Sequence, residues 1–185
     1  SRSLPIIIDI RSGDLDKSKL KRKLYNHIIK FEASLFSRIM ILSESLAKLL
    51  KLKEGSYDVV PLGADEISSE QRQYDAVKMI YVGTLQQRDI HKTVEGLADF
   101  CEKYPEADIE YDIIGFGLPE EERQLKQMIE KYGLSNKVFF HGRVNYENLK
   151  PFFDKANLGV AFVPMTPYYD CQPSTKIYEY VLSGM

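Results

Sequence analysis

The sequence lacks the features that mark several common classes of protein. Its 185 residues include only two cysteines, Cys101 and Cys171, which are too few and too far apart for a disulfide framework. No apolar run approaches the roughly 20 residues of a membrane-spanning helix, and no signal-peptide pattern opens the chain. The formal net charge of −2 argues against a nucleic-acid partner, which would require a surplus of lysine and arginine. These absences predict a soluble, cytoplasmic protein that binds no nucleic acid.

Metal-ligand spacing is also missing. The three histidines, His27, His91 and His141, share no spacing with one another. Neither cysteine has a partner at the interval that zinc sites use. We therefore expect no metal site.

The first 60 residues alternate between short apolar runs and helical periodicity. Apolar and β-branched runs predict strands over residues 5–10, 38–42 and 57–60. Helical spacing covers residues 17–36 and a second segment that Ser43 would cap. The order strand, helix, strand, helix, strand implies a parallel sheet with right-handed crossovers.

The helix predicted over residues 17–36 has two distinct faces. Apolar side chains recur at three- and four-residue intervals, which predicts one buried stripe. The stripe consists of Leu20, Leu24, Ile28, Phe31 and Leu35. The cations of the other face are Lys19, Arg22, Lys23 and Lys30. Lysine-rich amphipathic helices are usually solvated, but such a face also suits peripheral contact with an anionic membrane, and the sequence leaves both interpretations open.

A change in composition separates this segment from the rest of the chain. Residues 61–74 contain proline, glycine, paired serines and several Gln and Glu residues but no apolar period, and we assign them as a linker. Strands are then predicted over residues 78–82, 109–114, 137–141 and 158–163, and helices over 93–104, 121–132, 146–155 and from about 174. This alternation predicts an α/β domain with a doubly wound parallel sheet over residues 75–185.

The last predicted helix begins with hydroxyl, cationic and acidic side chains. Ser174 can open the helix after Pro173, which places Thr175 and Lys176 in the first turn. Unpaired backbone N–H groups and the helix dipole attract anions there. Glu179 would lie about one turn further in, within reach of sugar hydroxyls next to a bound phosphate. This combination is suited to holding a phosphorylated sugar compound.

Small residues follow several of the predicted strands. Ligands of open parallel sheets bind beyond the carboxyl ends of the strands, where glycine lets them approach the backbone. The segments concerned are Gly83-Thr84, Gly115-Phe116-Gly117 and Gly142-Arg143. Arg88 and Lys92 follow the first of these loops and, with Lys176, could surround a diphosphate. Tight turns and solvated charges would explain the same residues individually.

Taken together, these segments resemble the retaining glycosyltransferases of family 4, also called glycosyl transferases group 1, which have the two-domain GT-B architecture. VVPLGAD (59–65) is similar to the crossing from the acceptor domain to the donor domain. IYVGTL (80–85), DIIGFG (112–117) and VFFHGRV (138–144) are similar to the first three donor-domain strands with their loops. PSTKIYEY (173–180), with Gly184, resembles the helix that grips the donor.

The resemblance implies a domain organisation and a function. Residues 1–60 would be the C-terminal part of an acceptor-side Rossmann-like domain, and residues 75–185 a nucleotide-sugar donor domain that stops before its last strands. We expect transfer of a sugar from a nucleotide-sugar donor to the hydroxyl of a sugar or lipid-linked sugar acceptor, in surface polysaccharide or glycoconjugate biosynthesis. The anomeric configuration would be retained without a metal, and no cofactor is expected because the nucleotide-sugar is itself a substrate. Because the acceptor domain would be incomplete, we expect this chain alone to be inactive.

The resemblance also implies roles for individual residues. Glu179 would hold the ribose hydroxyls. The donor diphosphate would be bound by Gly83, Thr84, Arg88, Ser174, Thr175 and Lys176. The base would lie against Gly115, Phe116, Arg143 and Val144. The donor sugar is assigned to Asp170, Cys171 and Gln172, although many family members have a glutamate where Cys171 stands. No residue is assigned as catalytic.

Two other functions fit the same pattern. One is a nucleotide-sugar-binding module without catalysis, and the other is a nucleotide-sugar epimerase of the same two-domain architecture. An epimerase needs acid and base groups that face the sugar, and the sequence contains no convincing cluster of histidines or carboxylates for that role.

Overall fold

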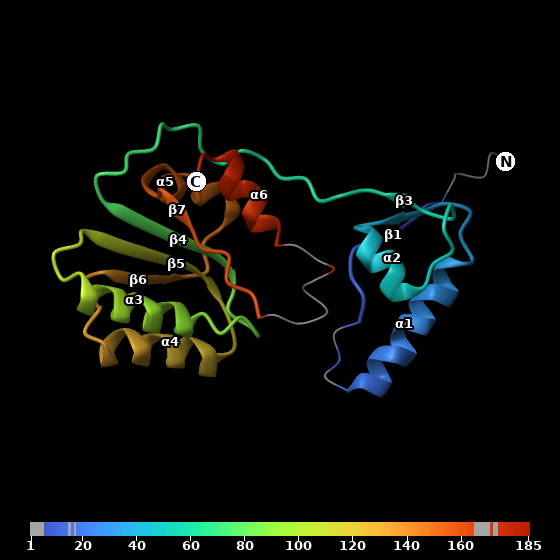
Figure 1. Ribbon diagram of the computed structural model, residues 1–185, viewed down its shortest axis with the longest axis horizontal. Coiled ribbons are helices and arrows are strands. Elements are labelled where there is room, and N and C mark those ends of the chain that lie inside the picture. Colours follow the sequence, from blue (N-terminus) through green and yellow to red (C-terminus); the bar gives the residue numbers. More distant parts are fainter. Residues whose placement is uncertain (1–5, 15, 17, 165–170, 172–173) are drawn as a thin grey trace. The chain divides into compact units, whose positions relative to one another are not determined.

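The computed structural model describes residues 6–14, 16, 18–164, 171 and 174–185. These residues form two compact units (Figure 1). The first extends to Gly63 and includes Cys171, and the second consists of Ala64–Pro164 and Ser174–Met185. Each unit has its own parallel sheet and its own apolar core.

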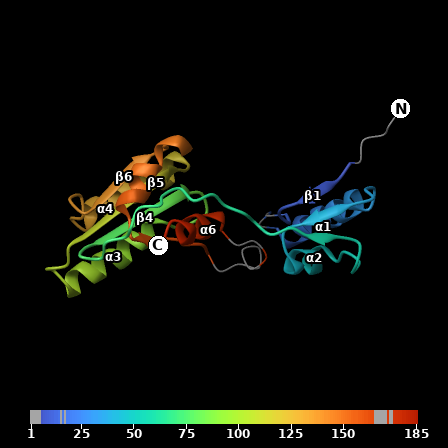
Figure 2. The same ribbon diagram turned by 90° about the horizontal axis from the view of Figure 1, so that it is seen from above.

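The first unit has the βαβαβ order that its sequence predicts. Its three parallel strands lie in the order β1 (Ile8–Ile10), β2 (Ile39–Ile41), β3 (Asp58–Val59). The connecting helices are α1 (Lys19–Ala33) and α2 (Glu44–Leu50), which lie side by side (Figures 1 and 2). Ser43 caps α2 as predicted, because its hydroxyl oxygen accepts a hydrogen bond from the Leu46 N–H at 3.1 Å.

The buried face of α1 differs from the prediction. The apolar stripe from Leu20 to Leu35 is exposed, with Leu20 81% and Phe31 66% accessible. The face turned inward carries Asn26, Ile29 and Ala33 instead. The prediction was wrong because apolar periodicity defines one face of a helix but does not identify the surface that covers it. The small Ala33 packs fully buried in the core, and the Asn26 amide accepts a hydrogen bond from the loop before the helix.

The second unit is a four-stranded parallel sheet with helices on both faces. Its strands lie in the order β6 (Val138–Gly142), β5 (Ile109–Phe116), β4 (Val77–Thr84), β7 (Leu158–Gly159). Its helices are α3 (His91–Lys103), α4 (Pro119–Lys131), the 3₁₀ turn η1 (Tyr146–Asn148), α5 (Lys150–Lys155) and α6 (Thr175–Leu182). The predicted α/β fold with a doubly wound parallel sheet is confirmed.

Alternate side chains of the central strands build a separate core on each face of this sheet. Tyr111 and Ile113 pack on one face with residues of α3 and α4. Ile114 points to the other face, where it packs with Phe153 of α5 and Tyr180 of α6. Most side chains of these strands are apolar on both sides because helices cover both faces, as is typical of buried parallel sheets (Figure 1).

Two elements are shorter than the sequence predicts. The helix expected over 146–155 is divided into η1 and α5, because Pro151 stands in the first turn of α5, where its missing N–H is tolerated. The strand expected over 158–163 pairs with β4 only at Leu158–Gly159, and one further hydrogen bond joins the Val160 N–H to the Ile80 carbonyl at 2.8 Å. Residues 161–163 then leave the sheet and become part of a cavity wall.

Candidate functional site

Helix α6 is held against the sheet by its tyrosine. Tyr180 is buried, and its hydroxyl oxygen accepts a hydrogen bond from the Val82 N–H at 2.9 Å. Its ring lies so close to β7 that a Cβ at Gly159 would meet it at 2.4 Å, so only glycine fits there. These contacts place the first turn of α6 beside the carboxyl end of β4.

A cavity of about 230 Å³ lies where β4 ends and α6 begins. One wall is the end of β4 and its loop, another is the chain that follows β7, and the third is the first turn of α6. The lining residues include Gly83, Thr84, Arg88, Ser174, Thr175 and Lys176. These are the six residues that the sequence assigns to the donor diphosphate. The structure thus brings together two groups that are about 90 positions apart in the sequence.

The loop after β4 is strained on both sides of Arg88. Gln87 and Asp89 have left-handed backbone angles, with φ of 57° and 51°. Such angles are uncommon for residues other than glycine and persist only where the surroundings enforce them. The Gln87 N–H donates a hydrogen bond to the carboxylate of Glu121 at 3.1 Å. The conformation turns Arg88 into the cavity wall.

Lys92, which the sequence also offers as a diphosphate ligand, has a partner of its own. Its ammonium group lies 2.8 Å from the Asp89 carboxylate. The hydrogen bond from Lys92 holds the pKa of Asp89 below its ordinary value. The pair fixes the start of α3, and Lys92 adds no third cation to the Arg88 and Lys176 that line the cavity.

The first turn of α6 carries an ion pair. Ser174 is the N-cap residue, and its side chain makes no capping hydrogen bond. The Lys176 ammonium lies 2.7 Å from the carboxylate of Glu179, a residue that is only 9% exposed. A cation on the cavity wall is therefore paired with the carboxylate that the sequence assigns to ribose. A ligand that spans both groups would exchange this ion pair for contacts of its own.

The residues assigned to the base lie at the ends of β5 and β6. Gly115 is paired with Gly83 across the sheet, and a Cβ on Gly115 would stand 1.9 Å from the Gly83 carbonyl oxygen. The guanidinium carbon of Arg143 lies 4.8 Å from the centre of the Phe116 ring. Val144 packs against the core under α5 and α6. Phe116 and Arg143 are both exposed, and their planar groups lie together beyond the carboxyl ends of the strands, where ligands of such sheets bind.

Of the three residues assigned to the donor sugar, Asp170 and Gln172 lie outside the described residues. Cys171 belongs to the first unit. Its carbonyl accepts a hydrogen bond from the Ser43 hydroxyl at 2.9 Å, and its side chain packs against the core of that unit.

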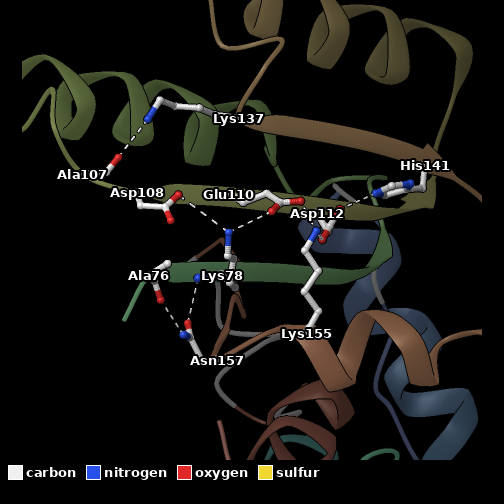
Figure 3. A network of polar contacts seen from close by, with 10 residues as sticks. All are labelled: Ala76, Lys78, Ala107, Asp108, Glu110, Asp112, Lys137, His141, Lys155 and Asn157. Carbon is white, nitrogen blue, oxygen red and sulfur yellow. Dashed lines mark hydrogen bonds and ion pairs between the residues drawn. The ribbon is translucent and has the colours of Figure 1, made fainter. Parts of the chain in front are cut away.

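A polar network that the sequence analysis did not identify crosses the sheet of the second unit (Figure 3). The buried carboxylate of Asp112 accepts a hydrogen bond from His141 Nε2 at 2.6 Å and lies 3.3 Å from the Lys155 ammonium. Lys155 also pairs with Glu110, which lies 3.2 Å from the Lys78 ammonium. Burial raises the pKa of Glu110, but the hydrogen bonds from the two lysines outweigh it and hold that pKa below its ordinary value.

The network could be foreseen only in part. Glu110 and Asp112 are two positions apart in a predicted buried strand, so both carboxylates point to one face and require cations. Nothing in the sequence indicates that these cations are Lys78 and Lys155.

Arg72 was also missed, since it lies in a segment without apolar periodicity. Its guanidinium donates to the carbonyls of Ala156 at 2.9 Å and Ser183 at 2.7 Å, and also to that of Phe153. Ala156 and Ser183 are the C-cap residues of α5 and α6. Arg72 therefore satisfies the carbonyl ends of both helices, where a cation is favoured.

The described residues offer neither a metal site nor a membrane-spanning helix. Among the described residues, no three His, Cys, Asp or Glu side chains are grouped closely enough to hold a metal ion. No helix in the described part of the chain has the length and apolar character needed to cross a bilayer.

Residues 64–164 match the family model of the glycosyl transferases group 1. No curated protein matches the sequence. This span contains β4, β5 and β6 with their loops and most of the lining of the cavity.

Several solved structures have a similar fold. HepE from Anabaena, in complex with UDP and glucose, is 16% identical with a TM-score of 0.69, over 97% of this chain and 51% of HepE. The pneumococcal O-GlcNAc transferase GtfA, in complex with UDP and GlcNAc, is 13% identical with a TM-score of 0.68, over 98% of this chain and 36% of GtfA.

Sucrose-phosphate synthase from Thermosynechococcus elongatus is 17% identical with a TM-score of 0.62, over 83% of this chain and 43% of the synthase. The chain thus spans 36 to 51% of the length of these three proteins. At these identities the likeness concerns the fold. The family match covers more than half of the chain, and the chain therefore belongs to the glycosyl transferases group 1 family.

Proposed function

We propose that this chain contains the donor-binding part of a glycosyltransferase that transfers a sugar from a nucleotide-sugar to an acceptor hydroxyl. The observation that carries the proposal is the cavity between β4 and α6. Two cations, three serine and threonine hydroxyl groups and the amino end of a helix line it, in a unit that matches a glycosyltransferase family. A diphosphate is the part of a nucleotide-sugar that such a set of groups binds.

The surrounding residues support an order of subsites along the sheet edge. Glu179 would accept hydrogen bonds from the ribose hydroxyls once Lys176 turns to the diphosphate. The Phe116 and Arg143 pair offers two planar groups against which a base can stack. Because Gly83 and Gly115 are in direct contact, the diphosphate and base subsites would adjoin.

The chemistry of the proposed reaction requires positive charge at the diphosphate. Negative charge develops on this leaving group as the glycosidic bond breaks, so groups placed to meet it stabilise the transition state. Arg88 and Lys176 would supply that charge from this chain without a metal. Retention of configuration, membership of family 4 and a role in surface polysaccharide or glycoconjugate biosynthesis rest on the motif resemblance. A cytoplasmic location rests on the low cysteine content of the chain.

Calorimetric titration of the chain with UDP-, GDP- and ADP-sugars tests the donor site. One nucleotide series is expected to bind and to raise the thermal unfolding midpoint, because ligands selective for the native state stabilise it. Arg88→Gln should weaken binding of the nucleoside diphosphate by about tenfold or more, while binding of the nucleoside changes little. Arg123→Gln is the matched control, since that arginine is exposed on α4 and pairs with Glu120.

Equal affinity of the wild type and Arg88→Gln for the diphosphate would contradict the assignment. In turnover assays with a nucleotide-sugar and candidate acceptors, donor consumption should yield an acceptor product. Release of an epimeric nucleotide-sugar would instead indicate the epimerase, and binding without consumption would indicate a binding module.

A further inference from the structure

We propose that α1 of the first unit docks on an anionic phospholipid bilayer, with its apolar stripe in the interface and a basic groove beside it. The inference concerns the first unit and does not depend on the donor site. Two separate features of α1 carry it, and both lie outside the cavity described above.

The first feature is the exposed apolar stripe. Leu20, Leu24, Ile28 and Phe31 lie on one side of α1, and Leu35 follows just beyond its end. Their accessible fractions are 81%, 59%, 40%, 66% and 69%. A run of large apolar side chains along a single helix face is unusual on a surface that stays in water and marks an interaction site.

The second feature is a groove of about 230 Å³ between α1 and the end of α2. Its lining contains five fixed cations, one histidine and no carboxylate. The charged and ionisable residues are Lys19, Arg22, Lys23, His27, Lys30 and Lys51. No ion pair between described residues involves any of these lysines. Such a concentration of positive charge is complementary to phosphate groups.

The relative position of the two features favours a bilayer as the occupant. At 100° per residue, Lys23 and His27 flank one side of the stripe and Lys21 flanks the other. Helices that lie in the membrane interface have this arrangement, with Leu and Phe in the acyl boundary and lysines reaching the headgroups. A partner protein with an apolar groove would explain the stripe but not the accompanying groove of cations.

Cosedimentation of the chain with vesicles tests the proposal. We expect binding to vesicles of phosphatidylglycerol and phosphatidylcholine, no binding to phosphatidylcholine alone, and weaker binding as salt rises. Lys23→Gln with Lys30→Gln should weaken binding roughly tenfold or more, since each cation near an anionic surface contributes about a fivefold factor. Leu24→Ser with Phe31→Ser should also weaken it about tenfold. All four side chains are exposed, so neither variant opens the core.

The matched control is Lys53→Gln with Lys103→Gln, which removes two exposed lysines outside the groove and should bind like the wild type. Equal binding to neutral and anionic vesicles, or equal loss in the control, would overturn the proposal. So would a dimer in sedimentation velocity that Leu24→Ser with Phe31→Ser abolishes, because a second copy would then cover the stripe. If inorganic phosphate bound the groove as tightly as the anionic vesicles do, the ligand would be a free anion and not a bilayer, and the proposal would be overturned. Donor binding should be unchanged in every variant, which separates this outcome from the proposed function.

Discussion

At the scale of single residues, contacts with backbone atoms decide which positions can change. Gly115 stands so close to the Gly83 carbonyl that no side chain can enter, whereas a Cβ on Gly96 in α3 meets nothing within 4 Å. The same substitution should therefore have opposite effects at the two glycines.

Gly115→Ala should lower the free energy of unfolding by more than about 2 kcal/mol, because β4 and β5 must separate to admit the methyl group. Gly96→Ala should raise it by about 0.5–1 kcal/mol, because alanine favours the helix. Urea titrations of both variants measure the difference. An unchanged free energy of unfolding in Gly115→Ala would mean that the ends of β4 and β5 are not in contact.

Glu179 is the residue on which the ribose assignment depends. Glu179→Ala should weaken nucleotide-sugar binding by about tenfold to a hundredfold, because hydrogen bonds to a charged group contribute about 1.5–3 kcal/mol. The fold should remain intact, as circular dichroism would show. Glu147→Ala, at an exposed glutamate in η1, serves as the control. Unchanged affinity in calorimetry would remove Glu179 from the site.

At the scale of elements, the position of α6 is set by contacts at its middle and at its carboxyl end. Tyr180 joins the middle of α6 to β4. At the end of the helix, the Ser183 hydroxyl oxygen accepts hydrogen bonds from the backbone N–H groups of Ile67 and Ser68, each at 3.3 Å. Arg72 joins the same end to α5. The first turn of α6 can line the cavity only while these contacts hold the helix in place.

Arg72→Ala should lower the free energy of unfolding by about 2–4 kcal/mol, because it leaves carbonyls of two helix ends without their donor. Donor binding should fall as well, although Arg72 does not line the cavity. Arg72→Lys should restore little, since one ammonium group cannot reach both helix ends in the way that the planar guanidinium does. Arg123→Ala, at an exposed arginine, should leave the free energy of unfolding nearly unchanged in the same denaturation assay.

At the scale of the whole molecule, stability should depend on acidity through the network across the second sheet. Burial raises the pKa of Glu110, but Lys155 and Lys78 outweigh it, so the folded-state pKa lies below the ordinary value of 4.5. A carboxyl group with a lowered pKa stabilises the fold fully above its unfolded-state value. That contribution disappears as the pH falls through the lower, folded-state value.

Glu110→Gln should therefore lower the free energy of unfolding at pH 7, by about 1–2 kcal/mol. It should also flatten the loss of stability below about pH 4.5. Denaturation curves between pH 3 and pH 7 test this, and Glu106→Gln, at an exposed glutamate, provides the control. If the free energy of unfolding of Glu110→Gln fell as steeply with decreasing pH as that of the wild type, Glu110 would be excluded as the cause of the acid destabilisation.

Much of this molecule could be predicted from local patterns. Apolar runs and helical spacing identified the strands and helices of both sheets, and the glycine loops identified the edge at which the cavity lies. Ser174, Thr175 and Arg88 could be singled out because their neighbours in sequence already form a helix start and a strand end. Arg72 could not, because its role consists entirely of contacts with α5 and α6, more than 80 positions away along the chain.

The sequence by itself determined the order of strands and helices, since each depends on the periodicity of neighbouring side chains, and it determined the family through short motifs in that order. Only the tertiary structure decided which face of α1 is buried and which cations meet Glu110 and Asp112. It also decided that the loop after β4 and the start of α6 share one cavity. These features depend on residues that are far apart in the chain, and a local pattern carries no information about which distant surface will cover it.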